Sequence, residues 1–189
     1  MKNTGMNPSS NWLNAARDHW NWRGQSRPAF AVEPLPDQVS VWDFPRPPRL
    51  VQDAREVVIR WGDIEVARTQ HAILVLETAH PPSFYIPWDD VNRTLLQASE
   101  GSSFCEWKGP ARYWSLVKNQ QILRGVAWSY PKPLEGAEAL AHCVSFYPAQ
   151  LNCTVNGEKV SPQPGGFYGG WITPELVGPF KGEPGTQGW

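Results

Sequence analysis

The sequence has few of the features that mark disulfide-rich, zinc-binding or nucleic-acid-binding proteins. It holds three cysteines, Cys105, Cys143 and Cys153, and this odd count without a CxxC pair argues against a structural zinc site and a disulfide framework. Charged residues make up 19% of the chain, the formal net charge is −1, and no run of like charges occurs. This balance excludes a strongly basic surface of the kind that binds nucleic acids or anionic membranes. We therefore expect neither a nucleic acid nor a membrane as a partner.

Long hydrophobic runs are also missing. The longest, from Ala72 to Leu76, is far too short to span a membrane. The first twelve residues contain no apolar stretch typical of a secretory signal. We therefore expect a soluble protein of the cytoplasm.

Tryptophan and proline are abundant instead. The chain of 189 residues holds 11 Trp and 19 Pro, and its length suits one well-filled core. Each Trp needs a large buried face and a partner for its indole N–H, so we expect most rings in the core and a few at a ligand surface. Six prolines between residues 26 and 50 exclude a regular helix there and predict an extended strap that lies on the body.

Periodicity and turn residues predict the regular elements. An amphipathic helix is expected over about residues 10–22, with Ser9 or Ser10 as its N-cap, and a short helix is expected after Asp89 or Asp90. The other apolar segments read as strands, including hairpins at Gly62-Asp63 and Asn156-Gly157. The predicted strands cover residues 39–42, 56–61, 64–69, 71–77, 104–107, 111–117, 122–130, 143–147, 151–155 and 158–161.

These elements predict a mainly β protein with a few short helices. We expect one compact domain whose sheet is either folded or barrel-like. An N-terminal helix and Pro-rich strap (1–49) and a Gly/Trp-rich tail (163–189) should pack on a β-rich core (50–162).

Four blocks of sequence carry a resemblance to a known family. They read V-L-E-T-A-H-P-P-S-F-Y-I-P (75–87), F-C-E-W-K-G-P-A-R-Y-W (104–114), A-W-S-Y-P-K-P (127–133) and V-S-F-Y-P (144–148). In this order they resemble the domain of unknown function 427 family, and the terminal extensions resemble its longer branch. The resemblance implies a small, mostly β fold of the folded-sheet or tent-like kind, and no established reaction. The family also bears a nucleotidyltransferase-like label, but this sequence has neither a paired-carboxylate metal motif nor a Gly-rich phosphate loop.

Lys108 and Glu77 are the first candidates for chemistry. Lys108 lies among Trp107, Tyr113 and Trp114, where desolvation would free a nucleophilic amine, or where its charge would hold an anion. The alternative is a lysine whose stem lies along a ring while its head stays in water. Glu77 ends a buried strand and needs a cationic partner, so we expect either a proton-transfer pair or a structural ion pair.

Cys105 and His80 are weaker candidates. Cys105 becomes a nucleophile only where Lys108 or Arg112 lowers its pKa, and strand alternation from 104 to 108 would place Cys105 and Lys108 on opposite faces. An inert, buried thiol is therefore expected. His80 precedes two prolines in a turn, where we expect it to be accessible, and the other histidines lack ligand spacing, so no metal is expected.

These residues lead to two hypotheses about function. In the first, a pocket containing Tyr85, Arg112, Tyr113 and Trp128, together with the candidates above, binds a small planar or anionic molecule on which Lys108 and Glu77 act. In the second, the Trp- and Pro-rich terminal segments form a binding or assembly module without chemistry, for example a homodimer. Whether the protein is an enzyme, and which cofactor it would use, stays open.

Overall fold

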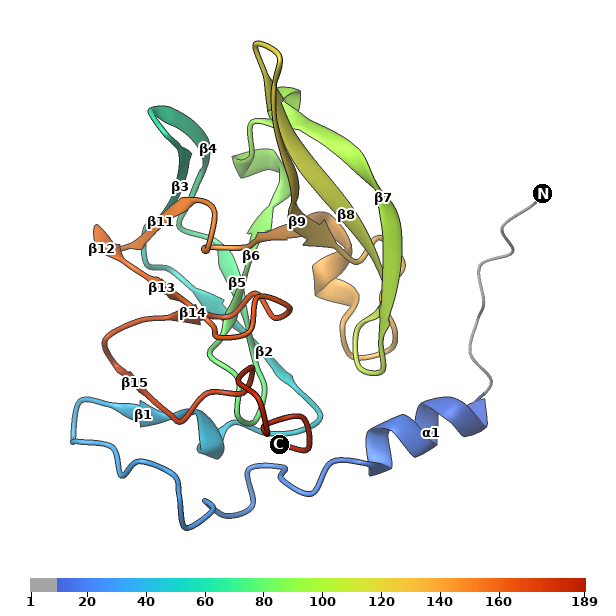
Figure 1. Cartoon of the computed structure of the whole chain (residues 1–189), viewed down its shortest axis with the longest axis vertical. Coiled ribbons are helices and arrows are strands. Elements are labelled where there is room, and N and C mark those ends of the chain that lie inside the picture. Colours follow the sequence, from blue (N-terminus) through green and yellow to red (C-terminus); the bar gives the residue numbers. More distant parts are fainter. Residues whose placement is uncertain (1–9) are drawn as a thin grey trace.

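A computed structural model describes residues 10–189, and it is built mainly from strands (Figure 1). Strands account for 41% of the described residues, which contain one α-helix. The helix is α1 (Ser10–Asp18), and 3-10 turns lie at Val41–Asp43, Trp88–Asp90, Arg93–Leu95 and Glu138–His142. The strands are β1 (Val39–Ser40), β2 (Arg49–Asp53), β3 (Val57–Trp61), β4 (Ile64–Thr69), β5 (Ala72–Leu76), β6 (Ser83–Pro87), β7 (Leu96–Cys105), β8 (Gly109–Lys118), β9 (Gln121–Ser129), β10 (Cys143–Phe146), β11 (Asn152–Val155), β12 (Glu158–Lys159), β13 (Ser161–Pro162), β14 (Trp171–Ile172) and β15 (Leu176–Val177).

Two antiparallel sheets form the body. A seven-stranded sheet has the order β2-β5-β6-β10-β9-β8-β7, and a four-stranded sheet has the order β12-β11-β3-β4. In the larger sheet β2 and β7 are edges that do not pair with each other, so no barrel closes. The prediction of a mainly β fold is confirmed, and its barrel-like alternative is wrong.

The seven-stranded sheet has apolar side chains on both faces. One face belongs to the main core, and the other carries a second cluster of buried side chains. Phe84 and Ile86 of β6 join the main core, which also contains residues of the smaller sheet such as Ile59. Tyr85 between them faces the opposite side and belongs to a second cluster with Trp128. This alternation follows from the two-residue period of a strand. Every residue of β5 is buried, as its unbroken apolar run predicts.

The helical predictions are too long. α1 ends at Asp18 rather than Trp22, so Trp20 lies beyond the helix, while Trp12 on it stays 48% exposed. The helix expected after Asp89 or Asp90 is replaced by two separate 3-10 turns. The expected N-cap Ser9 lies outside the described residues.

The hairpin between β7 and β8 also differs from its prediction. β7 ends at Cys105, and residues 106–108 form a turn rather than a strand. Gly109, which follows the turn, has a φ of +96°, a conformation that favours glycine. The prediction that alternation separates Cys105 from Lys108 is therefore wrong, because no strand connects them.

Both flanking segments pack on the body. β1 of the strap pairs in parallel with β15 of the tail, and Trp42 of the strap donates its indole N–H to the Pro179 carbonyl. Trp171 of the tail is fully buried, and its ring stacks on Phe84. The Trp-rich core expected from composition is thus partly built by segments outside the two main sheets.

Candidate functional site

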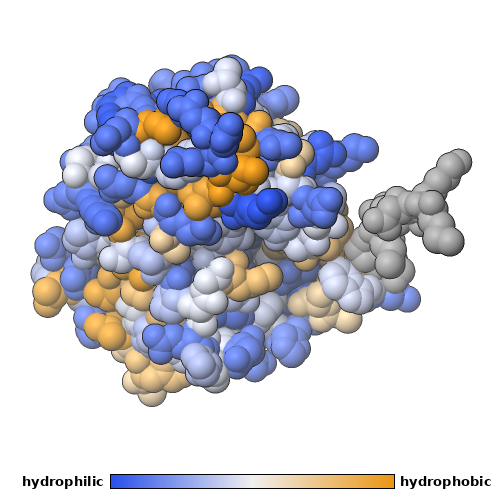
Figure 2. Space-filling view, turned by 45° about the horizontal axis from the view of Figure 1, so that its top comes forward, coloured by the Kyte–Doolittle hydropathy of each residue, from blue (hydrophilic) through white to orange (hydrophobic). Residues whose placement is uncertain are grey.

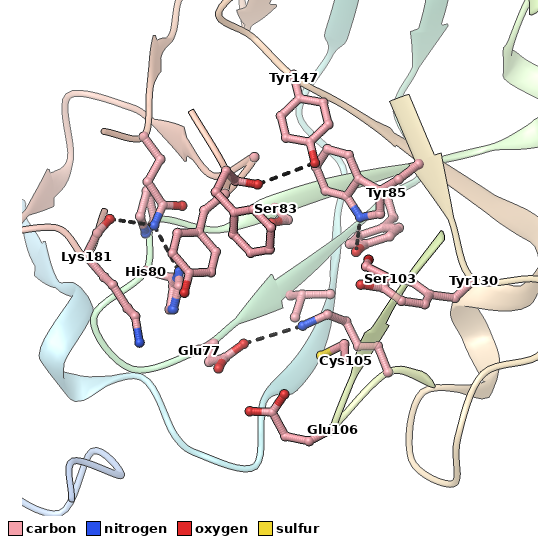
Figure 3. A pocket seen from close by; sticks show the side chains of 18 of the residues that line it. Glu77, His80, Ser83, Tyr85, Ser103, Cys105, Glu106, Tyr130, Tyr147 and Lys181 are labelled. Carbon is pink, nitrogen blue, oxygen red and sulfur yellow. Dashed lines mark hydrogen bonds and ion pairs between the residues drawn. The ribbon is translucent and has the colours of Figure 1, made fainter. Parts of the chain in front are cut away.

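A cavity of about 210 Å³ lies on the second face of the seven-stranded sheet. Its floor follows the register of the sheet, because Tyr85 pairs with Ser145, Ser145 with Trp128, and Trp128 with Tyr113. Residues opposite each other on neighbouring strands share a face. The lining comprises Val75, Glu77, His80, Pro81, Ser83, Tyr85, Ser103, Phe104, Cys105, Glu106, Lys108, Tyr113, Trp128, Tyr130 and Tyr147, with Trp20, Gln163, Phe167, Tyr168, Gly169 and Lys181 from the flanking segments (Figure 3).

A carboxylate shared by two cations lies at one side of this cavity. Glu77 follows β5 directly, and its side chain is 14% exposed. Its Oε2 lies 3.4 Å from Lys108 Nζ, and its Oε1 lies 3.3 Å from Nε of Arg46, whose side chain is fully buried. Arg46 also donates to the carbonyls of Trp22 and Thr78. Glu77 was predicted to need a cationic partner, and the structure gives it two, Lys108 and Arg46.

The pKa shifts indicate that this group is ionised at rest. Burial by itself raises the pKa of the Glu77 carboxyl, but Lys108, His80 and Arg46 outweigh it and lower the pKa to about 2. Burial lowers the pKa of the Lys108 ammonium, but the ionised Glu77 carboxylate beside it raises this pKa well above its ordinary value. Lys108 is therefore a protonated donor rather than a free amine.

Cys105 and Lys108 line the same cavity, because the residues that lead from one to the other form a turn at 106–108 and not a strand. Burial raises the pKa of the Cys105 thiol, and the opposing effect of Lys108 does not cancel this. A thiolate is the reactive form, so Cys105 rests as a neutral thiol.

Aromatic rings and hydroxyl groups form most of the remaining wall. Trp128 donates its indole N–H to the Tyr85 hydroxyl at 2.9 Å, and its ring lies 4.5 Å from that of Tyr147. Because the Tyr85 oxygen accepts this bond, its own O–H can donate to another molecule. The hydroxyls of Tyr113 and Ser103 lie 2.7 Å apart.

Two predicted site residues are placed differently from expectation. Arg112 is exposed and outside the cavity, because it alternates with Tyr113 along β8 and points away from that face. His80 is half-buried rather than freely accessible, with its ring edge-on to Tyr168 at 4.6 Å. The remaining predicted residues, Glu77, Tyr85, Cys105, Lys108, Tyr113 and Trp128, all line the cavity.

Several lining residues could not be identified from the sequence. Trp20 donates its indole N–H to Glu106 at 2.7 Å, and the Lys181 ammonium lies 3.7 Å from the centre of the Trp20 ring. Lys181 also donates to the carbonyls of Gln187 and Trp189, and burial lowers its pKa to about 8. The sequence of the tail combines glycines with large aromatic rings. This combination predicts that the tail is ordered and packed on the body, but it does not predict which part of the body the tail contacts.

Gly169 gives a testable example of this close packing. A Cβ at Gly169 would lie 2.1 Å from Cη2 of Trp128, a contact that requires the ring or the tail to move. We expect Gly169→Ala to destabilise the protein by about 1–3 kcal/mol, as overpacking commonly does. Gly188→Ala is the matched control, because no atom lies within 4 Å of its added Cβ. Urea unfolding measures both, and equal midpoints for the two variants would contradict the packing described.

The family model described as a domain of unknown function (DUF427) matches residues 49–157, which is more than half of the chain. The chain belongs to this family. The DUF427 domain supplies Glu77, Cys105, Lys108 and the aromatic floor, whereas Trp20, Gln163, Tyr168 and Lys181 lie outside the matched residues. A search of curated proteins finds no match.

Between residues 10 and 189, no group of three or more His, Cys, Asp or Glu side chains is arranged to hold a metal ion. No helix in the same range is long and apolar enough to cross a membrane.

Proposed function

We propose that this DUF427 protein binds a small, planar, monoanionic molecule in the cavity. The supporting observation is the pairing of one carboxylate, Glu77, with two cations, Lys108 and Arg46. The charges of the side chains that line the cavity sum to zero, because the positive charges of Lys108 and Lys181 equal in number the negative charges of Glu77 and Glu106. Arg46 behind Glu77 adds one positive charge, and an anionic ligand would neutralise it.

Hydrogen-bond capacity supports the same ligand. Among residues 10–189, Glu77 is the acceptor found for the Lys108 ammonium, at a long 3.4 Å, so two of its three N–H groups are available. The Tyr85 O–H is a second donor on the same face of the sheet, and Lys108 influences its pKa. A carboxylate of the ligand would accept from both.

Cavity size and wall shape suggest a single ring. A cavity of roughly 150 Å³ holds benzene in a protein core, so 210 Å³ suits one ring with a small substituent. Tyr85, Trp128 and Tyr147 offer the flat faces and edges that stack against such a ring. In this proposal the Lys108 ammonium binds the anionic group of the ligand. It does not act as a nucleophile, because its raised pKa disfavours the free amine that covalent chemistry requires.

Three isosteric probes test the proposal: benzoate, neutral benzamide and cationic benzylamine. We expect benzoate to bind with a dissociation constant at least about 10-fold lower than that of benzamide, because only benzoate offers a charged acceptor to Lys108. Benzylamine should bind weakest, since it adds a cation to a site with excess positive charge. Chemical-shift titration of the protein measures all three, and equal or reversed affinities would reject the anionic ligand.

A second proposal is a binding or assembly module that forms a homodimer. It draws on four exposed apolar side chains of the strap, Phe30, Val32, Leu35 and Val39, which are 43–62% exposed. Figure 2 shows that on one face hydrophobic atoms occur in separate patches between hydrophilic ones. This pattern favours the ligand proposal over a large apolar interface. Sedimentation at rising concentration tests it, and a monomer throughout would reject the dimer.

A further inference from the structure

The hydrogen bonding of His80, a lining residue of the cavity, is defined by Gln163 of the tail. Gln163, between β13 and the glycines at 165–166, accepts the Gly170 N–H at its Oε1 (3.1 Å). Its Nε2 donates to the Lys181 carbonyl at 2.7 Å. A backbone N–H only donates and a backbone carbonyl only accepts, so these two bonds determine which end of the Gln163 amide is the nitrogen.

The same amide nitrogen lies 2.9 Å from Nδ1 of His80. Because an amide NH₂ only donates, Nδ1 of His80 must accept and carries no proton. The neutral imidazole then holds its proton on Nε2, for which no acceptor is found among residues 10–189. In Figure 3 a dashed line marks this bond at one ring nitrogen of His80.

Burial and the nearby cations favour the neutral form of the His80 ring. Burial, with smaller effects of Lys181, Arg46 and Lys108, lowers the pKa of His80 to about 4, against the opposing effect of Glu77. Protonation would also place an N–H at Nδ1 directly against the Gln163 NH₂ group. The ring is therefore held in one tautomer across the physiological range.

We propose that His80 is a fixed, neutral donor to the ligand through Nε2–H, and that Gln163 is the positioning residue that selects this tautomer. This inference rests on the proposed anion pocket and extends it. A neutral donor needs an oxygen acceptor but adds no charge, so the ligand class becomes a single-ring monoanion with a second oxygen substituent. The charged group meets Lys108, and the second oxygen meets His80.

The tautomer can be tested without any ligand. In the full chain with ¹⁵N-labelled histidine, we expect His80 to show an unprotonated Nδ1 and a protonated Nε2 from pH 5 to 8. His80→Phe identifies its signals among the four histidines. Gln163→Glu should move the proton to Nδ1, because a carboxylate there accepts instead of donating. An Nδ1–H tautomer or a protonated His80 at pH 6 in the wild-type protein would overturn the inference, whether or not the Gln163 variant folds.

Ligand selectivity separates this inference from the proposed function. Benzoate and its three hydroxybenzoate isomers are the probes, and at least one isomer should bind more tightly than benzoate. His80→Phe, which keeps a ring against Tyr168, should remove that gain of about 3- to 10-fold, so that no hydroxybenzoate binds the variant more tightly than benzoate does. An equal loss for all four probes would make His80 structural only and overturn its role as donor. Failure of benzoate itself to bind would instead reject the anion pocket, with the tautomer measured independently.

Discussion

Glu77→Gln is expected to destabilise this protein by about 3–5 kcal/mol, the usual cost of removing one partner from a buried ion pair. The substitution leaves the fully buried Arg46 side chain and the 13% exposed Lys108 side chain without their shared carboxylate. Both cations would then lie in a poorly solvated site, which costs more than the hydrogen bonds that the glutamine amide can replace. Urea unfolding at pH 7 measures the difference.

Glu65→Gln is the matched control, because it removes a carboxylate from an ion-paired but exposed position. Glu65 accepts from Arg60 and Arg68 with its side chain 40% exposed, and surface pairs contribute about 0–1 kcal/mol. Similar losses in the two variants would contradict the view that burial, rather than pairing alone, makes Glu77 important for stability.

The pH dependence of stability has a predictable sign at Glu77. Its folded pKa of about 2 lies below the ordinary 4.5, so the unfolded chain takes up the proton first as pH falls. The stabilisation is complete above pH 4.5 and is lost between about pH 4.5 and 2, amounting to about 3 kcal/mol at 1.36 kcal/mol per pKa unit. Glu77→Gln should lack this acid-dependent loss.

Lys108→Met is expected to weaken benzoate binding by about 10- to 100-fold, which is the worth of one charge-assisted hydrogen bond. Methionine keeps much of the length and apolar stem of lysine, so the cavity wall is retained while the ammonium is removed. Benzamide binding should change little, because its neutral oxygen gains less from the charge. Lys118→Met, at the exposed end of β8, is the control in which both affinities should match the wild type.

The mainly β fold and a third of the residues that line the cavity were predictable from the sequence, for identifiable reasons. The alternation around Tyr85 and the apolar run of β5 follow from strand periodicity, and the cost of burying Glu77 alone required a cation nearby. The pairing with Lys108 was therefore predictable, but Arg46 was not, since it enters from the irregular, Pro-rich strap.

The missed features depend on backbone geometry and on long-range packing. The turn at 106–108 is followed by the positive φ of Gly109, whereas the expected strand ran to Trp107 and the expected connection was K-G-P at 108–110. Trp20, Gln163 and Lys181 reach the cavity from segments without periodic patterning, so no local rule assigns them to a face. The tautomer of His80 likewise follows from its bond to Gln163, 83 positions away, and from the two bonds that orient the Gln163 amide.

Lys108 gives this cavity its proposed preference for anions. The most direct test of this role is the ratio of the benzamide to the benzoate dissociation constant, measured by chemical-shift titration in the wild type and in Lys108→Met. We predict a ratio of about 10–100 in the wild type that falls to near 1 in the variant and is retained in Lys118→Met. A ratio that is the same in the wild type and in Lys108→Met would contradict the account.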